Sequence, residues 1–152
     1  MIKPLRWFAL VLFTLLPALA SAQQQGLEID IIGGNASALP ITVVPMPYQG
    51  TAAAPATDVA AVVRADLERS GAFRTLPVAS ITERPTRGGE IQYPTWRALR
   101  QDYLVVGRVA DAGDGSYRVE YELFDVAKQE RMLGLAMTAR ASAMRDVAHQ
   151  MA

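Results

Sequence analysis

The sequence predicts an α/β fold in which a single mixed β-sheet is packed by two to three helices. Three observations predict it. Several short stretches are β-branched or alternate apolar with polar residues, which is typical of strands. Other stretches repeat apolar residues at helical spacing. These stretches follow one another as strand, strand, helix, short optional strand, helix, three strands and helix. A length of 152 residues, 51% of them hydrophobic, indicates one domain with one core.

The first 22 residues predict a secretory signal peptide. Two basic residues precede an apolar run over residues 7–16, and small residues lead up to Ala22. Because this is the pattern of an exported chain, we expect cleavage between Ala22 and Gln23. The apolar run is shorter than the ~20 residues of a membrane-spanning helix. No cysteine follows that could carry a lipid, so we expect no direct membrane anchor.

A mobile partner-binding segment is expected at residues 23–34. Its strand, over residues 27–31, alternates aliphatic and acidic side chains, and Gly33 and Gly34 end it. A strand of this kind near a free terminus can add to the edge of another protein's sheet. The alternative is that it pairs within its own sheet, and the two states can also exchange.

The next elements are a strand over residues 41–44 and a helix. Thr57 is expected to cap the helix and Gly71 to end it in a left-handed conformation. Arg64 and Glu68 are expected to form an ion pair on its solvent side. Apolar residues at helical spacing form its buried stripe: Val59, Val62, Val63 and Leu67.

The middle of the chain predicts a loop, a short helix and the central strand. Residues 81–92 are rich in proline, arginine and glycine without an apolar pattern, which indicates a solvated loop. Pro94 suits the first turn of a short helix over 95–101 that presents Trp96. The apolar run over 103–109 predicts a strand that is covered on both faces.

A hairpin and a last helix complete the expected fold. The dipeptide Asp114-Gly115 predicts a tight turn between two strands. In the strand after it, four apolar side chains face one way and three charged ones, Arg118, Glu120 and Glu122, face the other. A third strand over 132–140 precedes a helix that Ser142 is expected to cap. Because that helix lacks a C-terminal stop signal, we expect a chain cut from a longer protein.

Composition argues against most enzyme chemistry. Fifteen basic and fifteen acidic residues cancel, so no net charge favours a nucleic-acid partner. The chain has no cysteine and a single histidine, His149, which excludes a thiol nucleophile and any Cys-ligated or multi-His metal site. We expect no catalytic residue, no cofactor and no metal site.

Two further functions remain as alternatives. Glu120 and Glu122 share one face of a strand and could serve as the paired carboxylates of a hydrolase, although a solvated sheet face explains them more simply. The second alternative is a small-ligand-binding domain that uses the loop face of the sheet. Asp111 and Asp114 could offer oxygens to Ca²⁺, but their place beside a turn explains them better. His149 is more simply a histidine of the helix surface than a general base.

Five segments in order carry a resemblance to a known family. They are ITVVP at 41–45, ADLERSGAF at 65–73, WRAL at 96–99, VVGRV at 105–109 and DGSYRV at 114–119. With these segments behind a signal peptide, the sequence resembles the TolB N-terminal domain family of the Tol–Pal envelope system. The resemblance implies an α/β domain over residues 35–152, similar to anticodon-binding domains. In the family a β-propeller follows, and it is absent from this chain.

The resemblance also implies a function. It implies a non-enzymatic periplasmic adaptor that links the inner membrane, the outer membrane and peptidoglycan in outer-membrane invagination at cell division, envelope integrity and protein import. The implied partners are TolA, bound by the segment after the cleavage site, and the lipoprotein Pal, bound mainly by the propeller. The residues that face TolA, carried over by position, are Leu27, Glu28, Ile29, Asp30, Ile31 and Ile32.

Overall fold

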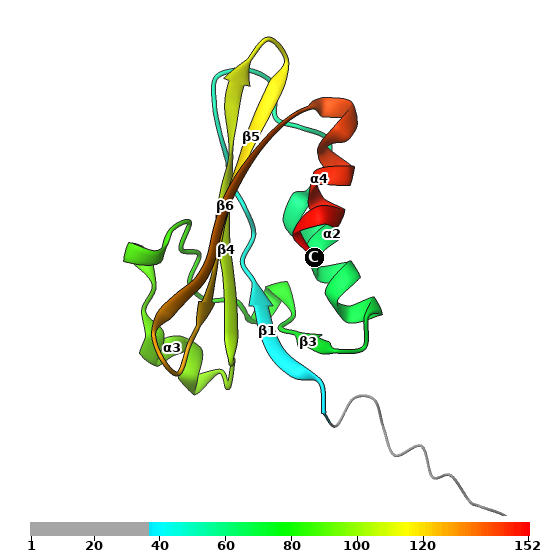
Figure 1. Ribbon diagram of the computed structural model, residues 1–152. Helices are drawn as coiled ribbons and strands as arrows, with labels where there is room; N and C mark the ends of the chain where they lie inside the picture. Colours follow the sequence, from blue (N-terminus) through cyan, green and yellow to red (C-terminus); the bar gives the residue numbers. More distant parts are fainter. Residues whose placement is uncertain (1–36) are drawn as a thin grey trace, which may run out of the picture. The chain divides into compact units, whose positions relative to one another are not determined.

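The computed structural model describes residues 37–152, and these form a mixed β-sheet in the strand order β3-β1-β4-β5-β6 (Figure 1). The strands are β1 (Leu39–Val43), β2 (Tyr48–Gln49), β3 (Phe73–Thr75), β4 (Tyr103–Gly113), β5 (Ser116–Asp125) and β6 (Glu130–Arg140). β1 pairs in parallel with β3 and β4, and β2 pairs in parallel with β4. β4, β5 and β6 are antiparallel neighbours. The expected α/β fold is confirmed, whereas the strand expected at 27–31 lies outside the described residues.

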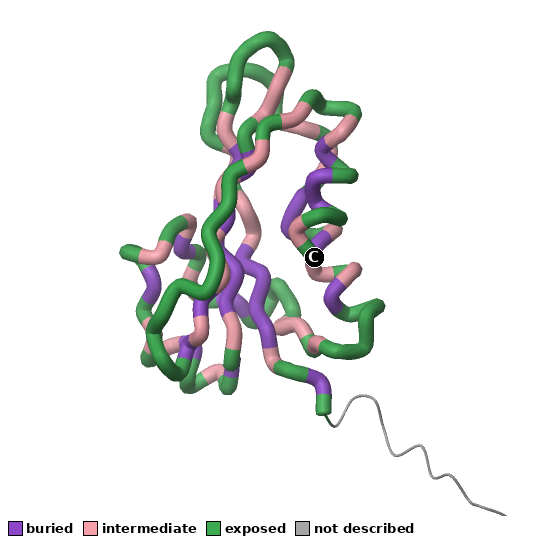
Figure 2. The backbone as a smooth tube through the Cα atoms, viewed as in Figure 1, coloured by how far each residue is buried: buried purple, intermediate pink, exposed green. Residues whose placement is uncertain are grey.

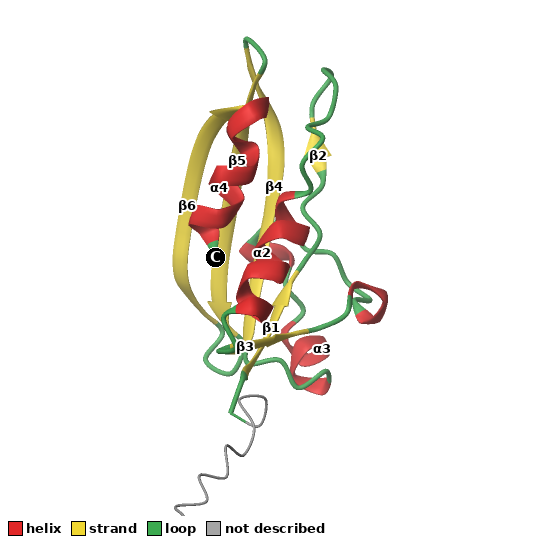
Figure 3. Cartoon of the chain, turned by 90° about the vertical axis from the view of Figure 1, so that its right-hand side faces the viewer, coloured by secondary structure: helices red, strands yellow, loops and turns green. Residues whose placement is uncertain are grey.

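Helices and turns lie on both faces of the sheet. α2 (Val59–Arg69) and α4 (Met144–Met151) lie side by side on one face (Figures 1 and 3). The short helix α3 (Tyr93–Ala98) lies on the opposite side, among connecting segments. Three single 3₁₀ turns, Val78–Ser80, Gly88–Glu90 and Ala141–Ala143, link these elements.

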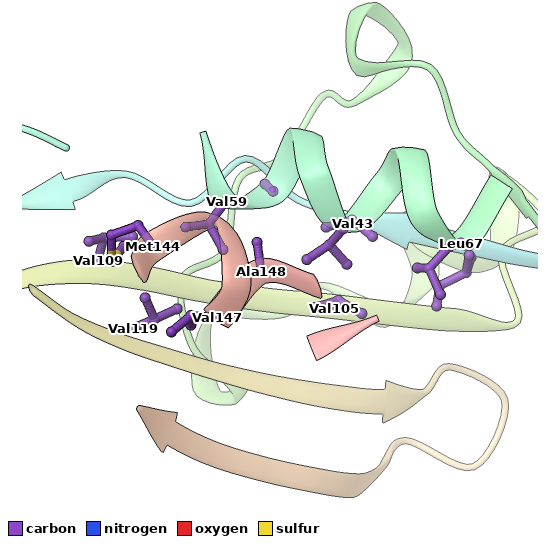
Figure 4. Close-up of a cluster of buried hydrophobic side chains, with 12 residues drawn as sticks. Val43, Val59, Leu67, Val105, Val109, Val119, Met144, Val147 and Ala148 are labelled. Carbon is purple, nitrogen blue, oxygen red and sulfur yellow. The ribbon is translucent and has the colours of Figure 1, made fainter. Parts of the chain in front are cut away.

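The larger hydrophobic core lies between the sheet and the helices α2 and α4. Figure 4 shows side chains of both helices directed at the sheet. Each helix supplies residues at helical spacing, as the sequence predicts, although Val62 is only partly buried. The labelled members are Val43, Val59, Leu67, Val105, Val109, Val119, Met144, Val147 and Ala148.

A second core lies on the opposite face, where the sequence predicted a solvated loop over 81–92. That prediction is wrong in part, because Ile81 and Ile91 are buried against the sheet together with Trp96, which has no exposed surface. Isolated apolar residues among prolines and arginines have no periodicity, so their burial could not be seen in the sequence. The segment is a cover for the sheet rather than a free loop.

The central strand and the hairpin follow the prediction. β4 has strands on both sides and cores on both faces, since Val105 and Val109 belong to one core and Leu104 and Val106 to the other. The hairpin turn places Asp114 at φ 50° and Gly115 at φ 70°, the positive angles that a type I′ turn requires.

Three local predictions for helices α2 and α4 are wrong. Asp58, rather than Thr57, caps α2, because its Oδ1 accepts a hydrogen bond of 2.9 Å from the backbone N–H of Ala61. Arg64 does not pair with Glu68; it donates to the carbonyl oxygen of Val43 at 2.9 Å, which ties the helix to β1. Glu68 instead accepts from the hydroxyl of Thr75.

Ser142 does not cap α4. The chain leaves β6 through the 3₁₀ turn Ala141–Ala143, so Ala143 takes the capping position and the N–H of Met144 donates to the carbonyl of Ala141. The short helix over 95–101 is also displaced: α3 ends at Ala98, because Arg100 adopts a φ of 55°. Gly71, by contrast, takes the predicted left-handed conformation at φ 72°.

Candidate functional site

The residues predicted to contact a partner lie outside the described part of the chain. This holds for Leu27 to Ile32 and for the cleavage site between Ala22 and Gln23. Their roles therefore stay predictions. Within residues 37–152, three features carry chemistry: a charged sheet face, a histidine–carboxylate contact and an apolar hollow.

The charged face lies on β4, β5 and β6, on the side away from α2 and α4. Glu120 accepts hydrogen bonds from Arg108 and, at 2.9 Å, from Nε of Arg118. Glu122 accepts from Nη1 of Arg131 at 2.9 Å and from the backbone N–H of Gly88 at 2.9 Å. These side chains line an open hollow of about 490 Å³. The two candidate carboxylates of a hydrolase thus share a face, as predicted, and both have cationic partners.

The electrostatics of this face do not suit hydrolysis. The hydrogen bond from Arg118, followed by the nearby charge of Arg108, lowers the pKa of Glu120 against the opposing effect of burial. A general acid needs a raised pKa, so that it still holds its proton at neutral pH. Glu120 is instead ionised and neutralised by arginine. The geometry therefore supports a structural ion-pair network at this site.

His149 joins α4 to α2. Its Nδ1 contacts Oδ2 of Asp66, which also accepts from Arg69. The hydrogen bond from His149 is the largest cause that lowers the pKa of Asp66. Ser70 lines the same surface depression, but its hydroxyl donates to the carbonyl of Leu67 at 2.6 Å. The hydroxyl of Ser70 thus satisfies a backbone carbonyl at the C-terminal end of α2. The His149–Asp66 contact holds α4 against α2.

The aspartates near the hairpin serve the turn. Oδ1 of Asp111 accepts a 2.9 Å hydrogen bond from the N–H of Gly113, and Asp114 occupies the turn itself. Within residues 37–152, no three His, Cys, Asp or Glu side chains gather closely enough to hold a metal ion. Over the same residues, none of the helices combines the length and apolar character needed to cross a membrane.

The apolar hollow, of about 290 Å³, lies on the helix side of the sheet near the end of α4. Its lining includes residues of β6 that are largely exposed: Met132 at 56% and Leu133 at 41%. Among the residues that line it, Tyr103 and Tyr121 alone have a side-chain hydroxyl or other oxygen or nitrogen atom. A small-ligand site also needs polar groups that orient the ligand. This hollow therefore offers a small ligand little beyond apolar contact.

Sequence reasoning missed the residues that shape the outer strand of the sheet. β6 is exposed along most of its length (Figure 2). The side chain of Arg131 lies over Gly134, which has no side chain to block it. Neither residue is identified as functional from the sequence. The available signal was the alternation of Leu133 and Leu135 with small residues, which becomes informative only once the edge position is known.

Comparison with known proteins identifies similar chains. The family model described as "TolB amino-terminal domain" matches residues 27–132. A protein named "Tol-Pal system protein TolB" from Xanthomonas campestris pv. campestris strain B100 is 73% identical over 99% of this chain and 34% of its own length. The TolB of Xanthomonas oryzae pv. oryzae strain KACC10331 is equally similar. The chain thus spans about a third of the length of the curated relatives it matches.

Solved structures agree with the fold. The crystal structure of TolB from Acinetobacter baumannii matches with a TM-score of 0.59 and 29% identity, over 75% of this chain and 26% of that one. The C-terminal domain of LpoB from Salmonella enterica matches with a TM-score of 0.54 and 10% identity, over 68% of this chain and 83% of that domain. The second likeness concerns the fold alone.

Proposed function

The chain belongs to the TolB amino-terminal domain family, and on that premise we propose that it acts as a non-enzymatic periplasmic adaptor of the Tol–Pal system. In this proposal residues 1–22 direct export and are removed, residues 23–34 bind a partner, and residues 35–152 form the domain that carries them. The adaptor links the inner membrane to the outer membrane and peptidoglycan during outer-membrane invagination and supports envelope integrity.

The observation that carries the proposal is where the family match begins. It starts at Leu27, the first residue of the alternating segment, so this segment falls within the matched domain. The proposed partner of the segment is TolA. Residues Leu27, Ile29 and Ile31 would share one face of an added strand, and Glu28 and Asp30 the other.

Strand addition suits an adaptor that must bind and release. Backbone hydrogen bonds to the edge of the partner's sheet supply affinity, while alternate side chains set register and specificity. A segment of few residues at a chain end can be released without unfolding the domain. Pal is the second proposed partner. In this proposal Pal is bound mainly by the β-propeller that, according to the family resemblance, follows this domain.

Features of residues 37–152 support a binding role over catalysis. The two strand carboxylates are held by arginines, and the single histidine is held by Asp66 between two helices. Sheet pairing and helix packing place the two glutamates in ion pairs with arginines and place His149 in contact with Asp66. The domain is thus suited to carry a partner-binding segment, and the glutamates and the histidine named above stabilise its fold.

The proposal predicts a specific loss of TolA binding when the alternation is broken. Replacing Ile29→Asp and Ile31→Asp puts charge on the apolar face of the strand, so binding to TolA in a pull-down should be lost. Circular-dichroism melting of the chain should stay nearly unchanged, because the proposal assigns these residues to a partner-binding segment separate from the domain of residues 35–152.

A matched control adds the same charge outside the strand. The double substitution Thr51→Asp and Ala52→Asp, at two exposed loop residues outside the partner-binding segment, should retain TolA binding. Retained binding by the Ile29→Asp, Ile31→Asp variant, with its altered segment intact by mass spectrometry, would remove this mechanism.

A further inference from the structure

The outer edge of β6 is unpaired among residues 37–152. β6 pairs with β5 on one side, and no strand of the described chain pairs with its other side. The strand is eleven residues long and contains neither proline nor lysine, the residues that commonly block an edge. The register of β6 against β5 shifts at Met132, which has no partner residue in β5. The regular part of the free edge therefore runs over residues 133–140, and its outward backbone N–H and C=O groups are available to another strand.

The two faces beside this edge differ in chemistry. On the helix side, Leu133 and Leu135 are 41% and 49% exposed and lie opposite Leu123 and Tyr121 of β5. On the other side, β6 presents small residues, Gly134 and Ala136, next to the charged hollow. An added strand would therefore meet an apolar strip on one face and a charged surface on the other.

The charged surface favours anions. Four arginines and two glutamates line the hollow: Arg87, Arg108, Arg118, Arg131, Glu120 and Glu122. Glu90 pairs with Arg87 at 3.0 Å, so that with this residue the four arginines exceed the three glutamates by one positive charge; Glu130 is the one carboxylate of β6. Since each guanidinium carries five N–H donors, the ion pairs observed here leave donors for further acceptors.

Arg131 brings this positive charge to the edge itself. Its Nη1, Cδ and Cζ atoms lie 3.4, 3.5 and 3.6 Å from the position that a Cβ of Gly134 would occupy. The guanidinium therefore lies over Gly134 on the charged face of the sheet, where its Nη1 also donates to Glu122 of β5. A strand added at the free edge would place every second side chain on this same face. A carboxylate at that position would reach Arg131, and the residues before and after it would face Leu133 and Leu135.

We propose that the free edge of β6 binds an extended peptide segment of a partner protein in which aliphatic and acidic residues alternate. The segment adds to the sheet through backbone hydrogen bonds. Its aliphatic side chains extend the apolar strip of Leu133 and Leu135, and its carboxylates bind Arg131 and the neighbouring arginines. This site is separate from the proposed TolA-binding residues 27–32, and the experiment below tests it independently of that proposal.

The test uses the full chain and a blocked synthetic peptide that alternates leucine and glutamate. Backbone amide shifts measured by NMR should change along β6 as peptide is added. The same peptide with lysine in place of glutamate should bind about tenfold more weakly, because its charge opposes that of the arginines. The Arg131→Glu variant should reverse this preference.

A matched variant makes the same charge change on the opposite edge of the sheet. Arg74→Glu alters an exposed arginine of β3 and should leave peptide binding unchanged. Equal binding of the two peptides, equal effects of the two variants, or shifts away from β6 would overturn the proposal. So would self-association of the chain through β6, seen by sedimentation without peptide, since a second copy would then be the occupant.

Discussion

At the scale of single residues, the described carboxylates act mainly as partners of cations and of backbone N–H groups. Arg118 and Arg108 hold Glu120, Arg131 holds Glu122, and His149 with Arg69 holds Asp66. The pKa of Glu120 and that of Asp66 are both lowered, in each case with a side-chain hydrogen bond as the largest cause. A group whose pKa is lower in the folded state stabilises the fold only while it is ionised.

The Asp66 contact predicts an acid-dependent stability. Its pKa in the folded chain lies below the ordinary 3.8, so its contribution is full above that value and is lost as the pH falls through the folded pKa. The Asp66→Asn variant should therefore melt at a lower temperature than the unaltered chain at about pH 5 to 7, and the difference should close toward about pH 2.

The control for this prediction is Asp114→Asn, which alters an exposed aspartate without a salt bridge in the described chain and keeps a residue that favours the type I′ turn. Its melting temperature should track that of the unaltered chain across the same pH range. A gap between Asp66→Asn and the unaltered chain that does not change from neutral to acid pH would contradict the assigned cause.

At the scale of elements, the segment between β3 and β4 acts as the second cover of the sheet. Trp96 of α3 is fully buried with Ile81 and Ile91 over Leu104 and Val106. Its indole Nε1 is buried and has no hydrogen-bond partner within residues 37–152. The tryptophan thus contributes through packing.

Removing this packing should destabilise the chain. Trp96→Ala leaves a large cavity and should lower the free energy of unfolding by about 3–5 kcal/mol, measured by urea unfolding followed by circular dichroism. Trp96→Phe keeps most of the ring volume and loses no hydrogen bond, so it should cost less. An unaltered unfolding free energy in Trp96→Ala would show that the segment is a dispensable loop.

How far the sequence predicts these elements depends on whether a pattern is local. The hairpin at Asp114-Gly115 and the central strand β4 were predicted because positive φ angles and a continuous apolar run are local properties. β2 has only two residues, too few for any pattern. The sequence predicts Thr57 as the cap of α2, whereas the structure has Asp58. Threonine and aspartate have similar capping propensities, so the sequence alone does not decide between these two neighbours, and the folded geometry does.

The candidate sites likewise could be predicted only where the pattern is local in the sequence. Glu120 and Glu122 were correctly placed on one strand face, since side chains two residues apart share a face. Their partners were not predictable, because Arg131 and Gly88 are distant in sequence and meet Glu122 only in the folded sheet. For the same reason the edge position of β6, which sets the surroundings of Leu133 and Leu135, required the strand order.

At the scale of the whole molecule, the chain is proposed to act as a domain that presents a binding segment and a binding edge. Hydrophobic cores lie on both faces of the sheet, and β6 forms its outer edge beside β5. The proposed second binding site is this edge. As a member of the TolB amino-terminal domain family, the chain is proposed to use residues 27–32 for TolA. These residues are the feature on which the proposed adaptor function depends.

Hydrogen exchange of the chain with and without TolA tests that claim most directly. If the proposed binding mode holds, amides of residues 27–31 exchange more slowly in the complex, because backbone hydrogen bonds to the edge of TolA protect them. Amides in the centre of β4 should keep the same exchange rate. Identical exchange of residues 27–31 in the free chain and in a TolA complex shown to be formed would contradict it.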